Sequence, residues 1–201
     1  MKDKALYISG WLLLVATGLT SVFLRVGLGE TAFQSLIPAR STTTTLPEEA
    51  GRVVRVVDAD TYDVLAGGTT YRVRLPGVDA PERDQPFGHQ AADSVARLLG
   101  SDRTVLLTRR GVDLYGRTLA SVRLPVAGGP ALALDSLLVV RGWAWAFDPK
   151  RRVAGRATQQ AAAVAARRGL WKCGAVGVLT PRQWRQFNYK NKRRYGVGCT
   201  W

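Results

Sequence analysis

Acidic residues are missing from the last quarter of this sequence. Residues 150–201 contain thirteen lysines and arginines and no aspartate or glutamate. Over all 201 residues, 29 basic side chains against 15 acidic ones give a net charge of +14 at pH 7. So one-sided a charge predicts attraction to a polyanion, either nucleic acid or an anionic membrane surface. A basic tail that only confers solubility is the alternative.

Cysteine and histidine are also scarce. The two cysteines, Cys173 and Cys199, are too few to define a disulfide framework, and whether they pair depends on the compartment. His89 is the only histidine; it lies in a polar loop before a predicted helix and is assigned no catalytic role. Apolar residues make up 46% of the chain, which is ordinary for a folded domain and too much for a disordered protein.

Charge is absent from residues 5–24, which follow Lys2 and Lys4 and precede Arg25. A helix of this length can cross the hydrocarbon core of a bilayer, which is roughly 30 Å thick. We expect residues 1–25 to form an uncleaved signal anchor, because the run exceeds a typical signal-peptide core and no A-x-A site follows. A cleaved signal peptide is the alternative. The folded part is then expected outside the cytoplasm, either membrane-anchored or, after cleavage, secreted.

Residues 26–50 have the composition of a linker, with Pro38, Pro47 and a run of serine and threonine. A folded domain is expected at residues 51–171 and a basic extension at 172–201. The pattern predicts strands at residues 52–65, 69–75, 104–107, 118–124 and 143–147, and helices at 90–99, 131–140 and 154–168. Five strands in a mainly antiparallel order, with two or three helices, predict an α+β fold built on a small closed β-barrel.

Five carboxylates gather in residues 57–82 of this otherwise basic chain. Phosphodiester hydrolysis needs an activated water and neutralisation of charge on the phosphate. A hard divalent cation held by carboxylates and carbonyls supplies charge and orientation, arginines grip phosphate oxygens bidentately, and a glutamate can deprotonate water. We therefore interpret the stretch as a metal site that receives a phosphate; turn-capping aspartates and solvated arginines are the alternative. The charged residues concerned are Asp58, Asp60, Asp63, Asp79, Glu82, Arg72 and Arg74.

Three pieces of sequence, in order, resemble the staphylococcal-nuclease (thermonuclease-like) family. They are residues 57–61 (VDADT), 74–82 (RLPGVDAPE) and 113–117 (DLYGR), followed by Gly169-Leu170-Trp171 after the last predicted helix. The resemblance covers about residues 51–171. It implies a five-stranded OB-fold barrel and a calcium-dependent phosphodiesterase, an endonuclease that acts on DNA and RNA and favours single-stranded or denatured substrate. Membrane contact is expected only through the N-terminal segment, and no protein partner is predicted.

The resemblance implies a Ca²⁺ site. Asp60 and Asp79 match the calcium-ligand aspartates of the family, and Ala80 matches a residue that ligates through its backbone carbonyl. Asp58 matches a nearby acid just outside the ligand set. Ala59 stands where the family commonly has glycine, and an alanine would be strained there if the position required a positive φ.

The resemblance also implies a phosphate clamp and a base. Arg74 and Arg117 match the phosphate-binding arginines, and Glu82 matches the residue usually assigned as general base. Tyr115 matches a tyrosine beside the bound nucleotide. A second aromatic that faces the nucleotide aligns loosely with either Trp145 or Phe147. Residues 180–185 (TPRQWR) faintly resemble an element that follows the domain in some bacterial relatives.

Two other functions remain open from the sequence. An OB-fold can bind oligonucleotides without catalysis, so the chain could be an inactive nucleic-acid-binding module tethered to the membrane. A membrane-surface or structural protein whose positive charge binds lipids is the other alternative, although this function does not explain the acid cluster. Because the acids and both arginines of the family pattern are present, we expect a nuclease.

Overall fold

The structure, a computed structural model, describes residues 46–100, 102–148, 153, 155–195 and 199–201. The predicted signal anchor at residues 5–24 and most of the predicted linker lie outside them. None of the helices in the described part of the chain is long and apolar enough to cross a membrane.

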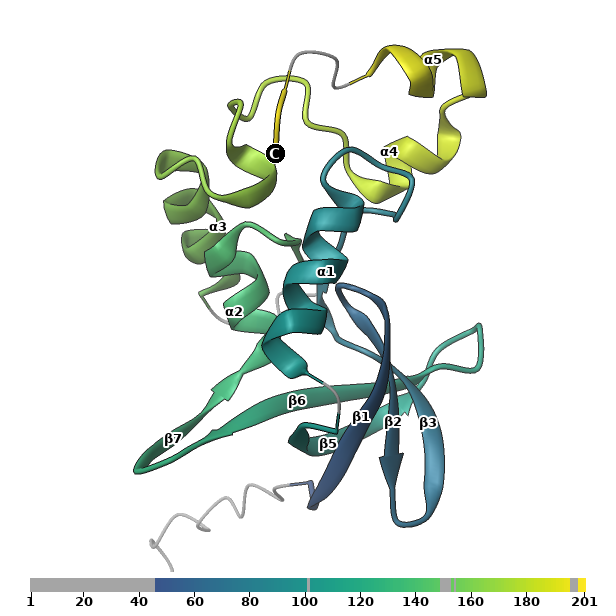
Figure 1. The fold of residues 1–201 in the computed structure, drawn as a ribbon, viewed down its shortest axis with the longest axis vertical. Coiled ribbons are helices and arrows are strands. Elements are labelled where there is room, and N and C mark those ends of the chain that lie inside the picture. Colours follow the sequence, from purple (N-terminus) through teal and green to yellow (C-terminus); the bar gives the residue numbers. More distant parts are fainter. Residues whose placement is uncertain (1–45, 101, 149–152, 154, 196–198) are drawn as a thin grey trace, which may run out of the picture. The chain divides into compact units, whose positions relative to one another are not determined.

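Five strands form a closed β-barrel (Figure 1). They are β1 (Glu48–Asp58), β2 (Thr61–Ala66), β3 (Thr69–Arg74), β5 (Thr104–Val112) and β6 (Thr118–Val126). Antiparallel pairings join them in the order β3-β2-β1-β5-β6, and a parallel pairing of β3 with β6 closes the ring. In that closing contact Arg74 lies opposite Leu119. The predicted five-stranded barrel of OB-fold type is confirmed.

The single strand expected at residues 52–65 is wrong, because the chain reverses at Ala59 and Asp60. β1 ends at Asp58 and pairs antiparallel with β2, with Asp58 opposite Thr61. The turn contains no glycine or proline, the strongest signals that separate two strands, although Asp58 and Asp60 are of a residue type common in turns. The hydroxyl of the fully buried Tyr62 donates a hydrogen bond to the carbonyl of Ala59, which ties the turn to the barrel interior.

The aromatic strand expected at residues 143–147 does not join the barrel. It is present as β8 (Trp145–Phe147), which pairs with β4 (Gly77–Asp79) in a separate two-stranded sheet. Asp79 lies opposite Trp145 in this pairing. The barrel therefore has five strands, as predicted, but they are not the five predicted strands. The expected first strand forms both β1 and β2, and the expected fifth strand lies outside the barrel.

The helices follow the predicted order with shifted ends. Predicted residues 90–99 are α1 (Gly88–Leu99), and predicted residues 154–168 contain α3 (Arg156–Ala165). The prediction at 131–140 is correct only in part, because its first residues belong to β7 (Gly129–Ala133), which pairs with β6. The remaining helices are α2 (Leu134–Arg141), the 3-10 turn η1 (Gly169–Trp171), α4 (Pro181–Gln186) and α5 (Tyr189–Arg194).

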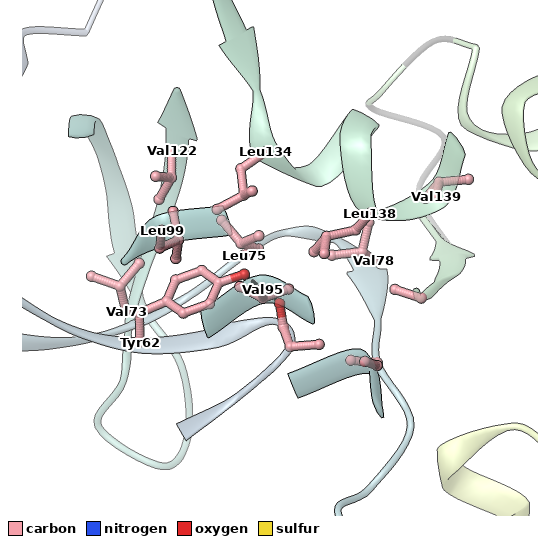
Figure 2. Close-up of a cluster of buried hydrophobic side chains, with 14 of the residues drawn as sticks. Tyr62, Val73, Leu75, Val78, Val95, Leu99, Val122, Leu134, Leu138 and Val139 are labelled. Carbon is pink, nitrogen blue, oxygen red and sulfur yellow. Dashed lines mark hydrogen bonds between the residues drawn. The ribbon is translucent and has the colours of Figure 1, made fainter. Parts of the chain in front are cut away.

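One hydrophobic core lies between the barrel and the helices. Figure 2 shows Tyr62 among side chains of β3 and α1. These side chains and those of α2 are almost fully removed from water, so each contributes about 1.5–3 kcal/mol of transfer free energy. The helices therefore stiffen the end of the barrel where Asp60 lies. The labelled core residues are Tyr62, Val73, Leu75, Val78, Val95, Leu99, Val122, Leu134, Leu138 and Val139.

The basic extension is ordered against the domain. A disulfide joins Cys173 to Cys199, and Trp184 of α4 is only 2% exposed. The indole Nε1 of Trp184 donates to Asp84 Oδ1 at 2.9 Å. The sequence predicted neither helix of the extension, since α4 and α5 are both too short to show helical periodicity.

Candidate active site

An open cavity of about 690 Å³ lies where the β1–β2 turn, the β4 segment and the β5–β6 loop meet. All eight site residues expected from the sequence line it: Asp58, Asp60, Arg74, Asp79, Ala80, Glu82, Tyr115 and Arg117. Six further residues line it: Thr61, Arg72, Pro81, Phe147, Arg182 and Arg185.

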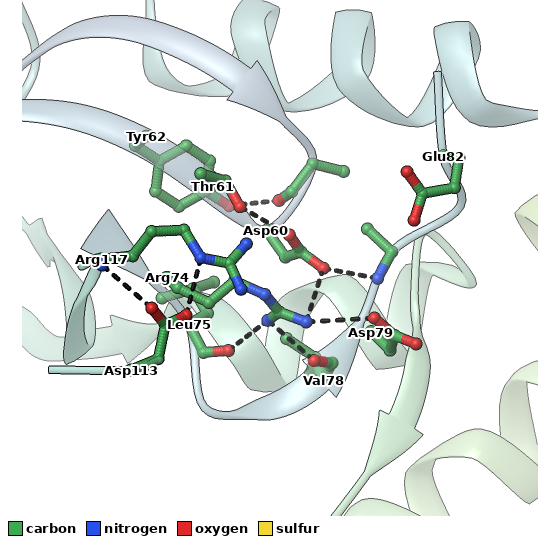
Figure 3. A network of polar contacts seen from close by, with 12 residues as sticks. Asp60, Thr61, Tyr62, Arg74, Leu75, Val78, Asp79, Glu82, Asp113 and Arg117 are labelled. Carbon is green, nitrogen blue, oxygen red and sulfur yellow. Dashed lines mark hydrogen bonds and ion pairs between the residues drawn. The ribbon is translucent and has the colours of Figure 1, made fainter. Parts of the chain in front are cut away.

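Asp60 is held in place on both carboxylate oxygens (Figure 3). Its Oδ1 accepts a hydrogen bond from the Thr61 hydroxyl at 3.0 Å, and its Oδ2 accepts one from the backbone N–H of Ala80 at 2.6 Å. The side chain is nearly buried, with 7% of its surface exposed. Asp60 thus links the β1–β2 turn to the segment that follows β4, and its position is fixed by the fold rather than by solvent.

Arg74 lies between Asp60 and Asp79 (Figure 3). Its Nη2 is 3.2 Å from Asp60 Oδ2 and 3.1 Å from Asp79 Oδ1. Its Nη1 donates to the Val78 carbonyl at 2.9 Å and also to the Leu75 carbonyl. These contacts satisfy the guanidinium in a mostly buried position and fix the relative placement of the two carboxylates.

Acidic side chains crowd this end of the barrel. Burial and then the neighbouring charge of Asp60 raise the pKa of Asp79 to about 6, although Arg74 opposes the shift. Burial, followed by the charges of Asp60 and Glu82, also raises the pKa of Asp58. Burial is the larger cause of both shifts, and repulsion between the neighbouring carboxylates adds to it. A bound cation would stabilise the ionised form of both carboxyls.

The donors present suit a hard cation. Asp60, Asp79 and the backbone carbonyl of Ala80 supply oxygen atoms, the ligand type that calcium and magnesium prefer. Within the described residues, no group of three or more acidic, histidine or cysteine side chains is arranged as a metal site. A cation held here would therefore take its other ligands from carbonyls and water, which is usual for calcium.

Glu82 sits in a tight loop before α1. Its backbone N–H donates to Gln85 Oε1 at 3.2 Å, and its carbonyl accepts from the Gln85 N–H at 2.9 Å. A side chain at Gly88 would collide with the Glu82 carbonyl, since a Cβ placed there would lie 1.9 Å from that oxygen. The glycine lets the start of α1 pack against this loop. The carboxylate of Glu82 forms an ion pair with Arg185 of α4.

The loop between β5 and β6 carries Tyr115 and Arg117. Asp113 Oδ1 accepts hydrogen bonds from both backbone N–H groups at 2.9 Å, and its Oδ2 accepts from Arg117 Nε at 2.7 Å. Burial alone would raise the pKa of Asp113, but the hydrogen bonds from Arg117 and Tyr115 outweigh it and lower the pKa. Asp113, which the sequence analysis did not single out, therefore orients Arg117. Tyr115 is 84% exposed and free to meet a ligand.

The structure distinguishes the two aromatic candidates. Phe147 lines the cavity and is 54% exposed, so it has the position expected of a side chain that faces a nucleotide. Trp145 is buried and packs edge-on against Trp171, with ring centroids 5.8 Å apart. Residues two positions apart on a strand share a face, so the burial of each side chain, not alternation along β8, distinguishes the two candidates.

Two cavity residues were not assigned to the site from the sequence, although they lie in residues 180–185, the segment with the faint second resemblance. Arg182 and Arg185 reach the cavity from α4, outside the part of the chain on which the resemblance rests. The sequence signal that could have found α4 is its capping box, in which Thr180 and Gln183 bond reciprocally, with Pro181 between them.

Comparisons with known proteins agree with this architecture. Residues 72–173 match the family model described as "Staphylococcal nuclease homologue". "Micrococcal nuclease" of Shigella flexneri is 43% identical over 101 residues, which are 48% of this chain and 58% of that protein. "Protein ParB" of Escherichia coli is 36% identical over 155 residues, covering 73% of this chain and 84% of the relative.

A third relative extends the pattern. An "Uncharacterized endonuclease" of Escherichia coli O157:H7 is 34% identical over 121 residues, or 60% of this chain and 76% of that protein. The family model and the names of the Shigella flexneri and Escherichia coli O157:H7 relatives support the expected class of enzyme, a nuclease that hydrolyses phosphodiester bonds. The family model matches half of the residues of this chain, and the two Escherichia coli relatives match over most of their own length. This chain therefore belongs to the staphylococcal nuclease family.

Proposed function

We propose that this chain is a calcium-dependent nuclease that hydrolyses the phosphodiester bonds of DNA and RNA. One observation carries the proposal: acids and arginines that lie far apart in the sequence line one open cavity. Acids alone would suit a cation and arginines alone an anion. Their combination suits a phosphodiester that meets a metal ion and arginines at once.

Asp60, Asp79 and the carbonyl of Ala80 would hold the calcium ion. When bound, the ion supplies positive charge for the phosphate and lowers the pKa of bound water. Burial and then the charge of Asp60 raise the pKa of Asp79, so a cation bound beside this carboxyl would stabilise its ionised form. Asp58, whose side chain is about one-third exposed, lies beside these residues and adds to the negative potential that attracts a cation.

Arg74 and Arg117 would bind the phosphate. Each guanidinium is fixed by a carboxylate, Arg74 by Asp60 and Asp79 and Arg117 by Asp113. A side chain that is already ordered loses less entropy when it binds. Among the described contacts, Arg117 uses only Nε–H and keeps both Nη groups for phosphate oxygens, whereas Arg74 keeps its Nε–H. They come from β3 and from the β5–β6 loop, so they approach the phosphate from two elements.

Glu82 would take a proton from the attacking water as general base. It lies on the rim of the same cavity, on a loop that Gln85 and Gly88 hold rigid. Tyr115 and Phe147, both exposed at the cavity, would contact the nucleotide by stacking, which tolerates any base and favours unpaired strands.

We further propose that the chain works outside the cytoplasm. The disulfide between Cys173 and Cys199 supports this location, because disulfides persist in oxidising compartments. The charge-free segment at residues 5–24 supports an anchor or a signal peptide.

Digestion of heat-denatured DNA and of RNA by the full chain tests the proposed function. We expect hydrolysis with added calcium, none after chelation, and recovery when calcium is restored. Tight binding of either strand without hydrolysis in calcium would instead support the inactive OB-fold module.

A further inference from the structure

The five arginines that line the cavity differ in how they are neutralised. Arg72 pairs with Asp63, Arg74 with Asp60 and Asp79, Arg117 with Asp113, and Arg185 with Glu82. Arg182 has no ion-pair or hydrogen-bond partner among the described residues, and it is exposed. An unneutralised guanidinium at the wall of a cavity is a binding group for an anion.

The helix that carries Arg182, α4, is held in place by packing and hydrogen bonds. Trp184 is buried against the domain and bonded to Asp84, and Lys192 Nζ donates to the other oxygen of Asp84 at 2.8 Å. Gln85 Nε2 donates to the Leu179 carbonyl at 2.6 Å, just before α4. The helix that presents Arg182 is therefore a fixed wall of the cavity rather than a mobile tail.

The extension also closes back on the loop that carries Glu82. The disulfide joins its two ends, and the ring of Trp201 lies 6.3 Å from that of Phe87. Arg182 and Arg185 are spaced i,i+3 on α4, so both project from neighbouring positions on one side of the helix. Together they add two cations to the cavity that Arg74 and Arg117 also line.

We propose that Arg182, with Arg185 beside it, forms a second phosphate site that binds a phosphodiester next to the one being cleaved. This inference rests on the proposed nuclease function, in which Arg74 and Arg117 hold the scissile phosphate. A single strand carries a phosphate at every nucleotide, so a strand in the cavity presents a neighbouring phosphate to α4. The extension is then part of the substrate site, and the second phosphate site favours polynucleotides over esters with one phosphate.

Strand binding by the full-length Arg182→Gln variant tests the second phosphate site. Affinity for a single-stranded oligonucleotide of about ten nucleotides, a length within the range of OB-fold sites, is measured by fluorescence anisotropy in chelator. We expect the affinity to fall about tenfold, the usual effect of losing one charge-assisted hydrogen bond. The slope of log affinity against log salt should decrease by about 0.7, the contribution of one phosphate contact on a single strand.

Turnover separates this site from the catalytic one. In calcium, Arg182→Gln should raise KM for denatured DNA and leave kcat/KM for bis(p-nitrophenyl) phosphate, an ester with a single phosphodiester, unchanged. Arg193→Gln is the matched control, because it removes the same charge from the exposed side of α5, away from the cavity. It should alter strand affinity about twofold or less, since exposed charges are screened by salt.

Equal losses of strand affinity in Arg182→Gln and Arg193→Gln would overturn the second phosphate site. An equal loss of kcat/KM for denatured DNA and for bis(p-nitrophenyl) phosphate in Arg182→Gln would also overturn it. Binding of the strand by the wild-type chain without hydrolysis would overturn the proposed function alone, and the binding comparison would still decide the role of Arg182. A wild-type chain that binds no strand would overturn both. Unchanged thermal unfolding of the two variants shows that neither effect comes from misfolding.

Discussion

Glu82 forms an ion pair with Arg185, which lies 103 positions later in the chain. The pair joins the loop proposed to carry the general base to the basic extension. Arg185 also acts on a proposed metal ligand, because its charge lowers the pKa of Asp79 against the larger opposing effect of burial. One side chain of the extension therefore influences both the base and the proposed cation site.

Replacing Arg185 with glutamine should strengthen calcium binding. The substitution removes a positive charge that repels a divalent cation at Asp79 and Glu82. For partly exposed charges a few ångströms apart, this repulsion corresponds to about three- to tenfold in affinity. Calorimetric titration of calcium into wild type, Arg185→Gln and the Arg193→Gln control checks it. Equal or weaker binding by Arg185→Gln than by the control would contradict the prediction.

Asp79 should destabilise the folded chain as the pH rises. Its pKa of about 6 in the folded chain exceeds the ordinary value of 3.8, so between these pH values the folded state holds a proton that the unfolded state releases. Stability contributed by this group therefore falls from about pH 4 to about pH 6 and is constant above. A pKa shift of about two units corresponds to roughly 3 kcal/mol in the free energy of unfolding.

The Asp79→Asn variant isolates this effect, because asparagine does not titrate. In urea unfolding with chelator, the free energy of unfolding of wild type should decline relative to the variant by about 2–3 kcal/mol between pH 4 and pH 7. A wild type that gains relative stability over that range would mean that Arg74 dominates and the pKa of Asp79 is lowered.

Ala59 should be better than glycine at its position. It is almost fully buried and its φ is not positive, so the strain expected from the family's glycine does not arise. Ala59→Gly removes a buried methyl group and increases the backbone entropy of the unfolded chain. We expect a loss of about 1–2 kcal/mol in the free energy of unfolding. Ala66→Gly, which removes a buried methyl group from β2, is the control and should lower the free energy of unfolding by a similar amount. A higher free energy of unfolding in Ala59→Gly than in wild type would contradict the prediction.

Removal of the disulfide should loosen the extension while leaving the barrel folded. The bridge spans 26 positions, and closing a loop of that size corresponds to about 3 kcal/mol in the unfolded chain. In the double variant Cys173→Ser/Cys199→Ser, hydrogen exchange of α4 and α5 should accelerate while exchange in the core strands stays slow. Unchanged exchange in α4 would show that Trp184 and Asp84 alone hold the helix.

Local sequence patterns predicted a five-stranded barrel, and the resemblance of three short pieces to the nuclease family predicted site residues that line one cavity. These pieces lie at the β1–β2 turn, the β3–β4 segment and the β5–β6 loop, and the last two contain glycine or proline turn signals. The β1–β2 reversal escaped prediction because Asp58, Ala59 and Asp60 include neither glycine nor proline. A turn closed by a buried tyrosine hydroxyl leaves no local signature.

The contributions of α4 could not be read from local patterns. Arg185 meets Glu82 and Trp184 meets Asp84 across about a hundred positions, contacts that only the docked extension creates. The order of α4 depends on packing and on the disulfide more than on helix propensity, which is weak over so few residues. The capping box at Thr180 and the faint resemblance of residues 180–185 to an element of bacterial relatives were the signals in the sequence.

The rate of calcium-dependent hydrolysis of denatured DNA by Glu82→Gln, against wild type, tests the central claim most directly. If Glu82 takes the proton from the attacking water, kcat falls by roughly two to four powers of ten, while strand affinity in chelator is kept. Arg117→Ala, measured alongside, should also lose activity, because it removes one half of the phosphate clamp. Full activity in both variants would contradict the assignment of this cavity as the nuclease site.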